Sequence, residues 1–117
     1  MHQDYASCIE ACNACAAACD HCATACLKEP DVAMMAECIR VDIDCAALCR
    51  LAAGYMARSS EFVHEACRLC AAICEACARE CGKHHHEHCQ ACARACRRCA
   101  DECNRIAGLG ATRGSRA

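Results

Sequence analysis

Six cysteines between residues 8 and 26 recur at intervals that alternate between four and three residues. An α-helix completes a turn every 3.6 residues, so residues spaced in this way lie one above the other on one side of the helix. The sequence therefore predicts a helix with a continuous stripe of thiols. In a helical bundle the corresponding stripe normally carries large apolar residues and faces the core. We expect the cysteine stripe to face inward in the same way.

The same stripe returns in three further segments, and this repetition organises the whole chain. We predict helices over residues of about 4–27, 31–57, 60–82 and 84–107. The second segment has the fewest cysteines, and its register places Met35 and Asp42 where cysteine is expected. The candidate metal-ligating thiols are, in chain order, Cys8, Cys12, Cys15, Cys19, Cys22, Cys26, Cys38, Cys45, Cys49, Cys67, Cys70, Cys74, Cys77, Cys81, Cys89, Cys92, Cys96, Cys99 and Cys103.

Residues that favour helix ends mark the borders of these segments. Pro30 is the only proline, and we place it in the first turn of the second helix. A serine in the next turn is expected to cap the third helix. Gly82 and Gly108 are expected to end the third and fourth helices.

Four helices of this length, joined by turns of two to four residues, must be antiparallel neighbours. The predicted fold class is therefore all-α, an antiparallel up-down-up-down four-helix bundle with a cysteine-lined core. Residues 1–108 are predicted to form the bundle and residues 109–117 a flexible C-terminal tail. Alanine often flanks the stripes, and such small side chains let thiols from facing helices reach one shared ion.

The composition restricts the compartment and the partners. A net charge of −2 lacks the basic excess of a nucleic-acid-binding surface. No segment approaches the roughly 20 apolar residues that span a bilayer, and the N-terminus lacks the features of a secretory signal. We therefore expect a cytoplasmic protein with no nucleic-acid or membrane partner. Cytosolic thiols are kept reduced, and 19 cysteines cannot all pair, so metal binding is favoured over a disulfide scaffold.

The spacing and number of the thiols favour one metal ion. Packing alone does not explain 19 cysteines, because leucine and valine fill space better. Zinc sites use closed sets of four ligands, and iron–sulfur clusters are wrapped by turns with Cys-Pro or glycine-rich sequences that this chain lacks. Cu(I) is soft, is selected by thiolates and accepts two or three ligands. One Cu(I) per thiolate leaves the core nearly neutral, so we expect a capacity of about one Cu(I) per cysteine, with Cys-x-x-x-Cys pairs as the repeating unit.

The repeated Cys-x-x-x-Cys-x-x-Cys ladder over residues of about 4–107 resembles the bacterial four-helix-bundle copper storage proteins, in particular their cytosolic branch. The resemblance implies a cysteine-lined bundle that stores multiple Cu(I) ions without a catalytic step, often as a homotetramer. A copper chaperone or a small thiol is the expected partner for loading and removal.

Weaker Cu(I) ligands gather at the end of the predicted bundle that holds the first and third turns. Met34 and Met35 open the second helix, and projecting the fourth stripe back four residues from Cys89 reaches His85. We therefore choose His85 as the histidine ligand and Met35 as the thioether ligand. The alternatives are a solvent-exposed histidine at the helix start for His85 and simple core packing for Met35. This end is expected to be the mouth for copper ions. The histidines that surround it are His84, His85, His86 and His88.

Asp42 is the one carboxylate in register with the stripes. It is a hard ligand poorly matched to Cu(I), so a hydrogen-bonding role and an oxygen-donor role both remain open. The end of the bundle opposite the mouth is expected to be closed by an apolar plug. Its members are Tyr5, Ile9, Leu51, Tyr55, Met56, Phe62, Val63 and Ile106.

Three functions remain for such a core. The first is Cu(I) storage for copper buffering, supply or detoxification, by a binding protein and not an enzyme. The second is a metallothionein-like store for zinc or cadmium. The third is a thiol redox buffer, which requires exposed thiols of low pKa and therefore conflicts with stripes that face inward.

Overall fold

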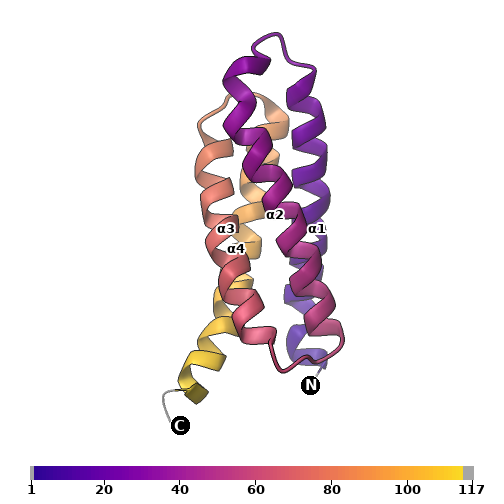
Figure 1. Cartoon of the computed structure of the whole chain (residues 1–117), viewed down its shortest axis with the longest axis vertical. Helices are drawn as coiled ribbons and strands as arrows, with labels where there is room; N and C mark the ends of the chain where they lie inside the picture. Colours follow the sequence, from indigo (N-terminus) through magenta and orange to yellow (C-terminus); the bar gives the residue numbers. More distant parts are fainter. Residues whose placement is uncertain (1, 115–117) are drawn as a thin grey trace.

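The computed structural model describes residues 2–114, and these form an elongated bundle of helices (Figure 1). Successive long helices run in opposite directions, which confirms the predicted up-down-up-down bundle. Among the described residues, no helix combines the length and the apolarity needed to cross a lipid bilayer. The elements are α1 (His2–Leu27), the short 3-10 helix η1 (Val32–Met35), α2 (Ala36–Ala57), α3 (Val63–Gly82) and α4 (Glu87–Gly114).

The first two turns differ from the sequence prediction. Pro30 lies in the turn between α1 and η1 and not in a first helical turn, because the second segment opens with the 3-10 helix at Val32. Ser60 does accept a hydrogen bond through its side chain, from the Phe62 N–H at 3.0 Å, but α3 begins only at Val63. The residues before Val63 form the turn that reverses the chain. Within this turn Ser59 adopts a left-handed backbone with φ of 54°.

Of the two helix ends predicted at glycines, one is confirmed and one is wrong. Gly82 is the last residue of α3, as predicted. Gly108 does not end α4, which continues to Gly114 and so takes in residues that we assigned to the tail. A single glycine inside a helix costs only about 1 kcal/mol relative to alanine and need not break it. Residues 115–117 lie outside the described residues, and flexibility of the tail stays a prediction.

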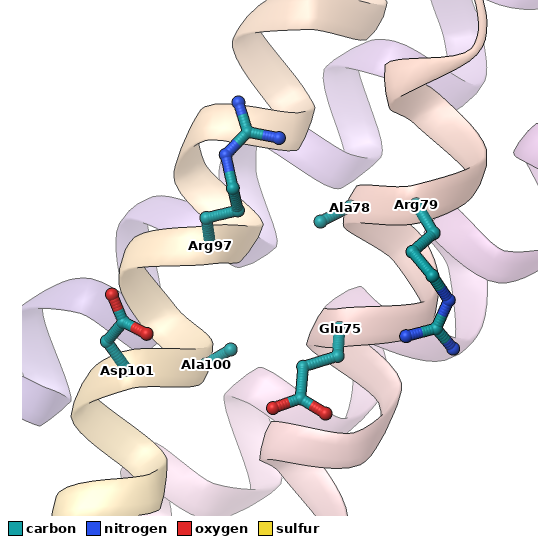
Figure 2. A pocket seen from close by; sticks show the side chains of 6 residues that line it. All are labelled: Glu75, Ala78, Arg79, Arg97, Ala100 and Asp101. Carbon is teal, nitrogen blue, oxygen red and sulfur yellow. The ribbon is translucent and has the colours of Figure 1, made fainter.

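Small residues bring the helices together in pairs. Among the long helices, α1 packs most closely on α2 and α3 packs most closely on α4. Buried alanines lie beside the cysteine stripes, for example Ala46 on α2, Ala71 on α3 and Ala93 on α4. Along the seam between α3 and α4, Ala78 and Ala100 form the floor of a shallow groove (Figure 2). The close approach of the backbones brings the four stripes into one column.

The prediction of an apolar plug is confirmed for most of its residues and wrong for two. Tyr5, Met56, Val63 and Ile106 are buried at the end of the column, and Ile9 and Tyr55 are partly buried against the core. Leu51 and Phe62 are exposed. Leu51 lies on the outer side of α2, two residues from the stripe, and Phe62 lies in the turn before α3. Both residues lie at the plug end of the bundle, but their side chains do not face its core.

Candidate metal centre

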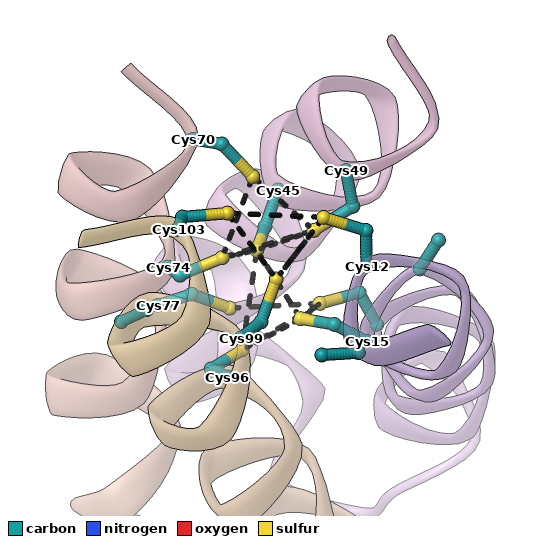
Figure 3. Close-up of a cluster of buried hydrophobic side chains, with 14 of the residues drawn as sticks. Cys12, Cys15, Cys45, Cys49, Cys70, Cys74, Cys77, Cys96, Cys99 and Cys103 are labelled. Atoms are coloured by element: carbon teal, nitrogen blue, oxygen red, sulfur yellow. Dashed lines mark hydrogen bonds between the residues drawn. The ribbon is translucent and has the colours of Figure 1, made fainter. Parts of the chain in front are cut away.

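The interior of the bundle is a column of thiols. All 19 cysteines are free, and each is fully buried. Figure 3 shows sulfurs from all four helices pointing toward one another at the centre. This arrangement follows from the three-four spacing, because each stripe turns the same side of its helix to the axis of the bundle.

The sulfurs lie at distances that suit shared metal ions. Sγ–Sγ contacts between helices range from 3.2 Å for Cys38 and Cys81 to 3.9 Å for Cys45 and Cys96. In seven Cys-x-x-x-Cys pairs the two sulfurs of one helix are 3.8–4.0 Å apart. Three thiolates at about 2.3 Å from a central ion would lie about 4.0 Å apart. The column therefore accommodates ions between three or more sulfurs with little movement.

Groups of four cysteines, each with sulfurs within 4.8 Å of one another, repeat along the column. They mix residues from different helices, so a site is made by the bundle and not by a single helix. Cys19 and Cys96 each belong to two of these groups, which means that neighbouring sites share ligands. From the mouth toward the plug they include Cys22–Cys26–Cys38–Cys89, Cys19–Cys77–Cys92–Cys96, Cys15–Cys19–Cys45–Cys96, Cys15–Cys49–Cys74–Cys99 and Cys12–Cys70–Cys99–Cys103.

Asp42 lies inside the column and is fully buried. Its Oδ1 atom accepts hydrogen bonds from the thiols of Cys77, Cys81 and Cys92, at 3.2, 3.3 and 3.2 Å. Its Oδ2 atom lies 3.9 Å from the sulfur of Cys38. Burial, which disfavours the charged form, raises the pKa of Asp42 to about 8. The carboxyl group is thus held by thiols and is neutral over much of the physiological pH range.

Burial also favours the protonated form of two thiols near the mouth. Desolvation raises the pKa of Cys26 to about 11 and raises the pKa of Cys89. A metal ion that binds thiolates must displace these protons, so metal binding and proton release are coupled. A thiol redox buffer is not favoured by this geometry, because such a function needs accessible, low-pKa thiols.

The histidine that meets the sulfurs is His88 and not His85. The Nδ1 atom of His88 lies 3.6 Å from the sulfurs of Cys22 and Cys89, and 3.8 Å from that of Cys26. His85 is exposed in the loop between α3 and α4. The projection failed because α4 begins only at Glu87, so the helical register does not extend back to His85.

The sequence held a signal for His88 that our projection did not use. His88 precedes Cys92 by four residues, the same step that joins His85 to Cys89. Only the position at which α4 begins decides whether His85 or His88 shares the stripe.

Glu29 orients the ring of His88, since its carboxylate accepts a hydrogen bond of 2.8 Å from the Nε2 atom of His88. That bond fixes the tautomer that leaves Nδ1 free to face the sulfurs.

The two methionines at the mouth occupy different environments. Met35 is fully buried at the end of η1, whereas Met34 is 74% exposed. The structure thus places Met35 within the core and Met34 on the surface. Ligation by Met35, and by any of the other candidates, remains a proposal.

The fold and the donor set together define a cysteine-lined bundle suited to holding several soft metal ions. The family model Csp, described as copper storage protein, matches residues 1–108. The Cu(I)-bound copper storage protein BsCsp3 has 52% sequence identity to this chain and a TM-score of 0.86, over 89% of this chain and 98% of that protein. This chain therefore belongs to the copper storage protein family.

Two further relatives agree with this assignment. A cytosolic copper storage protein from Streptomyces lividans, in a structure with five coppers, is 42% identical with a TM-score of 0.88, over 92% of this chain and 94% of that one. The uncharacterized cysteine-rich protein YhjQ of Bacillus subtilis (strain 168) is 52% identical over 84 residues, which are 72% of this chain and 78% of YhjQ.

Proposed function

We propose that this protein stores multiple Cu(I) ions in the thiolate column of its bundle, as a binding protein and not as an enzyme. The observation that carries the proposal is the set of 19 buried, free thiols, among which the sulfur–sulfur contacts measure 3.2–4.0 Å. Each Cu(I) replaces a thiol proton, so the filled core stays close to neutral. A buried excess of charge would be strongly unfavourable, and this limits the load to about one Cu(I) per thiolate.

Anaerobic titration of the reduced protein tests this function. With Cu(I), we expect saturation near one ion per cysteine. With Zn(II), we expect saturation at about four or five ions, because each tetrahedral zinc site uses four ligands. Saturation with Zn(II) at this level combined with weak Cu(I) binding would identify a metallothionein-like store instead. Stable internal disulfides in protein isolated from cells would favour a redox buffer.

The mouth gives a second prediction, about capture of the ions. His88, held in place by Glu29, is proposed to receive Cu(I) and pass it to Cys22, Cys26 and Cys89. Replacing Glu29 with alanine should lower the affinity of this outer site for Cu(I) by about tenfold, because the second-shell partner of a ligating histidine is lost. His88→Ala should have at least this effect. The rate and affinity of the first Cu(I) equivalents are measured by transfer from a coloured Cu(I) chelator.

His85→Ala is the matched control for this prediction, since His85 lies three residues before His88 but is exposed. It should load as the unsubstituted protein does. If His85→Ala impairs the first equivalents and His88→Ala does not, the assignment of the mouth histidine is wrong.

The remaining proposals concern location and partners. We propose a cytoplasmic protein that self-associates as a homotetramer and exchanges copper with a copper chaperone or a small thiol. The relative from Streptomyces lividans that is named as cytosolic supports the location. The family assignment supports storage of copper over catalysis.

A further inference from the structure

Two turns meet across the mouth through contacts between histidines and carboxylates. The turn after α1 supplies Glu29 and Asp31, the turn before α4 supplies His86, and the first turn of α4 supplies His88. The Nε2 atom of His88 lies 2.8 Å from the Oε2 atom of Glu29, and the Nδ1 atom of His86 lies 3.5 Å from the same oxygen. Three donor atoms therefore converge, on the edge of the His88 ring that does not face the sulfurs.

The spacing of these three atoms suits a tetrahedral divalent ion. Ligands at about 2.1 Å from such an ion lie about 3.4 Å from one another. The contact of 3.5 Å already matches this value, and the contact of 2.8 Å has to open by only about half an ångström. The side chains of His86 and Glu29 are 31% and 24% exposed, so water can reach the fourth position of the ion.

Asp31 holds the ring of His86 in the tautomer that such an ion needs. The Oδ1 atom of Asp31 lies 3.3 Å from the Nε2 atom of His86. A carboxylate that accepts the Nε2 proton leaves a free lone pair on Nδ1, the atom that faces Glu29. Carboxylates commonly orient metal-binding histidines in this way. The charges of Glu29 and Asp31 together also balance the charge of a divalent ion.

These donors favour a different ion from the one that the thiol column selects. Two imidazoles and a carboxylate suit a borderline ion such as Zn(II), whereas thiolates select Cu(I), and Mg²⁺ and Ca²⁺ prefer oxygen ligands alone. We propose that Glu29, His86 and His88 form a mouth cation site for one divalent ion of the zinc class per chain. In this site Asp31 positions the ring of His86.

An ion in the mouth cation site blocks the entry of copper. His88 takes part in both processes, because its Nδ1 atom lies 3.6 Å from the sulfurs of Cys22 and Cys89. A neutral imidazole carries one proton. When Nε2 binds the divalent ion, that proton stays on Nδ1, which then cannot bind Cu(I). This consequence rests on the entry of Cu(I) at His88 proposed above, whereas the cation site itself does not.

Co(II) tests the site, because it shows strong charge-transfer absorption when bound by thiolates and lacks this absorption when bound by nitrogen and oxygen. The metal-free, reduced protein is saturated with Co(II) under anaerobic conditions, and bound Co(II) is counted after equilibrium dialysis. The unsubstituted protein should hold one Co(II) per chain more than His86→Ala, with the same charge-transfer absorption. Asp31→Ala should weaken the binding of this one ion about tenfold.

His85→Ala is the control, since His85 is the exposed neighbour of His86. It should bind as many Co(II) ions as the unsubstituted protein, and circular dichroism should show that all variants remain helical. Equal Co(II) counts for the unsubstituted protein and His86→Ala would overturn the site, as would unchanged binding in Asp31→Ala. The Cu(I) capacity of His86→Ala should be unchanged, so the cation site and copper storage hold or fail separately.

Zn(II) tests whether the cation site blocks copper. Protein is first equilibrated with Zn(II) at a level that fills about nine tenths of the mouth sites, and transfer of the first Cu(I) from a coloured chelator is then timed. The unsubstituted protein should load about tenfold more slowly than His86→Ala, because only about one tenth of its chains have a free His88. Zn(II) in the thiol column is common to both proteins. Without Zn(II) the two should load equally fast, and equal rates with Zn(II) would overturn the block.

Discussion

Replacing Asp42 with asparagine is expected to make the stability of the metal-free protein much less dependent on pH. The pKa of Asp42 rises from 3.8 to about 8 in the folded protein, chiefly because its burial disfavours the charged form. Between these two values the unfolded chain has lost the proton and the folded chain retains it. Folding then takes up a proton, so the free energy of unfolding falls as pH rises.

The expected slope is about 1.4 kcal/mol per pH unit over the window between the two pKa values, and the contribution is fully present below pH 3.8. Asparagine keeps the shape of the side chain and remains uncharged, so it removes this slope. Urea unfolding of the metal-free protein under reducing conditions, followed by circular dichroism from about pH 5 to pH 7.5, measures the difference.

Asp44→Asn is the matched control, because Asp44 lies on the same helix but is exposed. It should retain the slope of the unsubstituted protein. The histidines at the mouth are present in all three proteins, so the comparison isolates Asp42. Equal slopes for the unsubstituted protein and Asp42→Asn would show that the carboxyl group is not held neutral by its burial.

Removal of one central sulfur is expected to have the second large effect. The Sγ atom of Cys96 lies 3.6 Å from that of Cys15, 3.8 Å from that of Cys19 and 3.9 Å from that of Cys45. Cys96 is also shared by two of the four-cysteine groups. Its loss therefore removes a ligand from two neighbouring sites. Cys96→Ala should lower the Cu(I) capacity by about two to four ions, because the bridging thiolate serves more than one ion.

Cys67→Ala provides the comparison at the plug end. Cys67 is also fully buried, but it lies outside the groups of four described above and interacts with Cys8 and Cys103. Its loss should reduce the capacity by about one ion. Both variants lose one buried sulfur. A difference in their Cu(I) capacity, measured by anaerobic titration, therefore reflects the position of that sulfur in the column. Equal losses would mean that each thiolate acts independently and that the column has no shared sites.

The fold and the thiol column could be predicted because both depend on local spacing. The stripe from Cys8 to Cys26 repeats on the other helices, and its period sets which side of each helix is buried. Gly82 ends its helix as expected. The projection to His85 was wrong because it extended a helical period beyond the first residue of α4. Helix starts depend on the turn that precedes them, and here that turn was longer than the sequence pattern indicated.

The sequence by itself determined that this chain is a four-helix bundle with inward-facing thiols, because the three-four period leaves one side of each helix to bury. Tertiary structure alone decided which groups from different helices meet. It placed Asp42 among Cys77, Cys81 and Cys92, and it brought His88 to the outer sulfurs beside Glu29. The physical reason is that the period fixes direction around one helix, whereas contacts across the core depend on the axial offset and rotation of neighbouring helices.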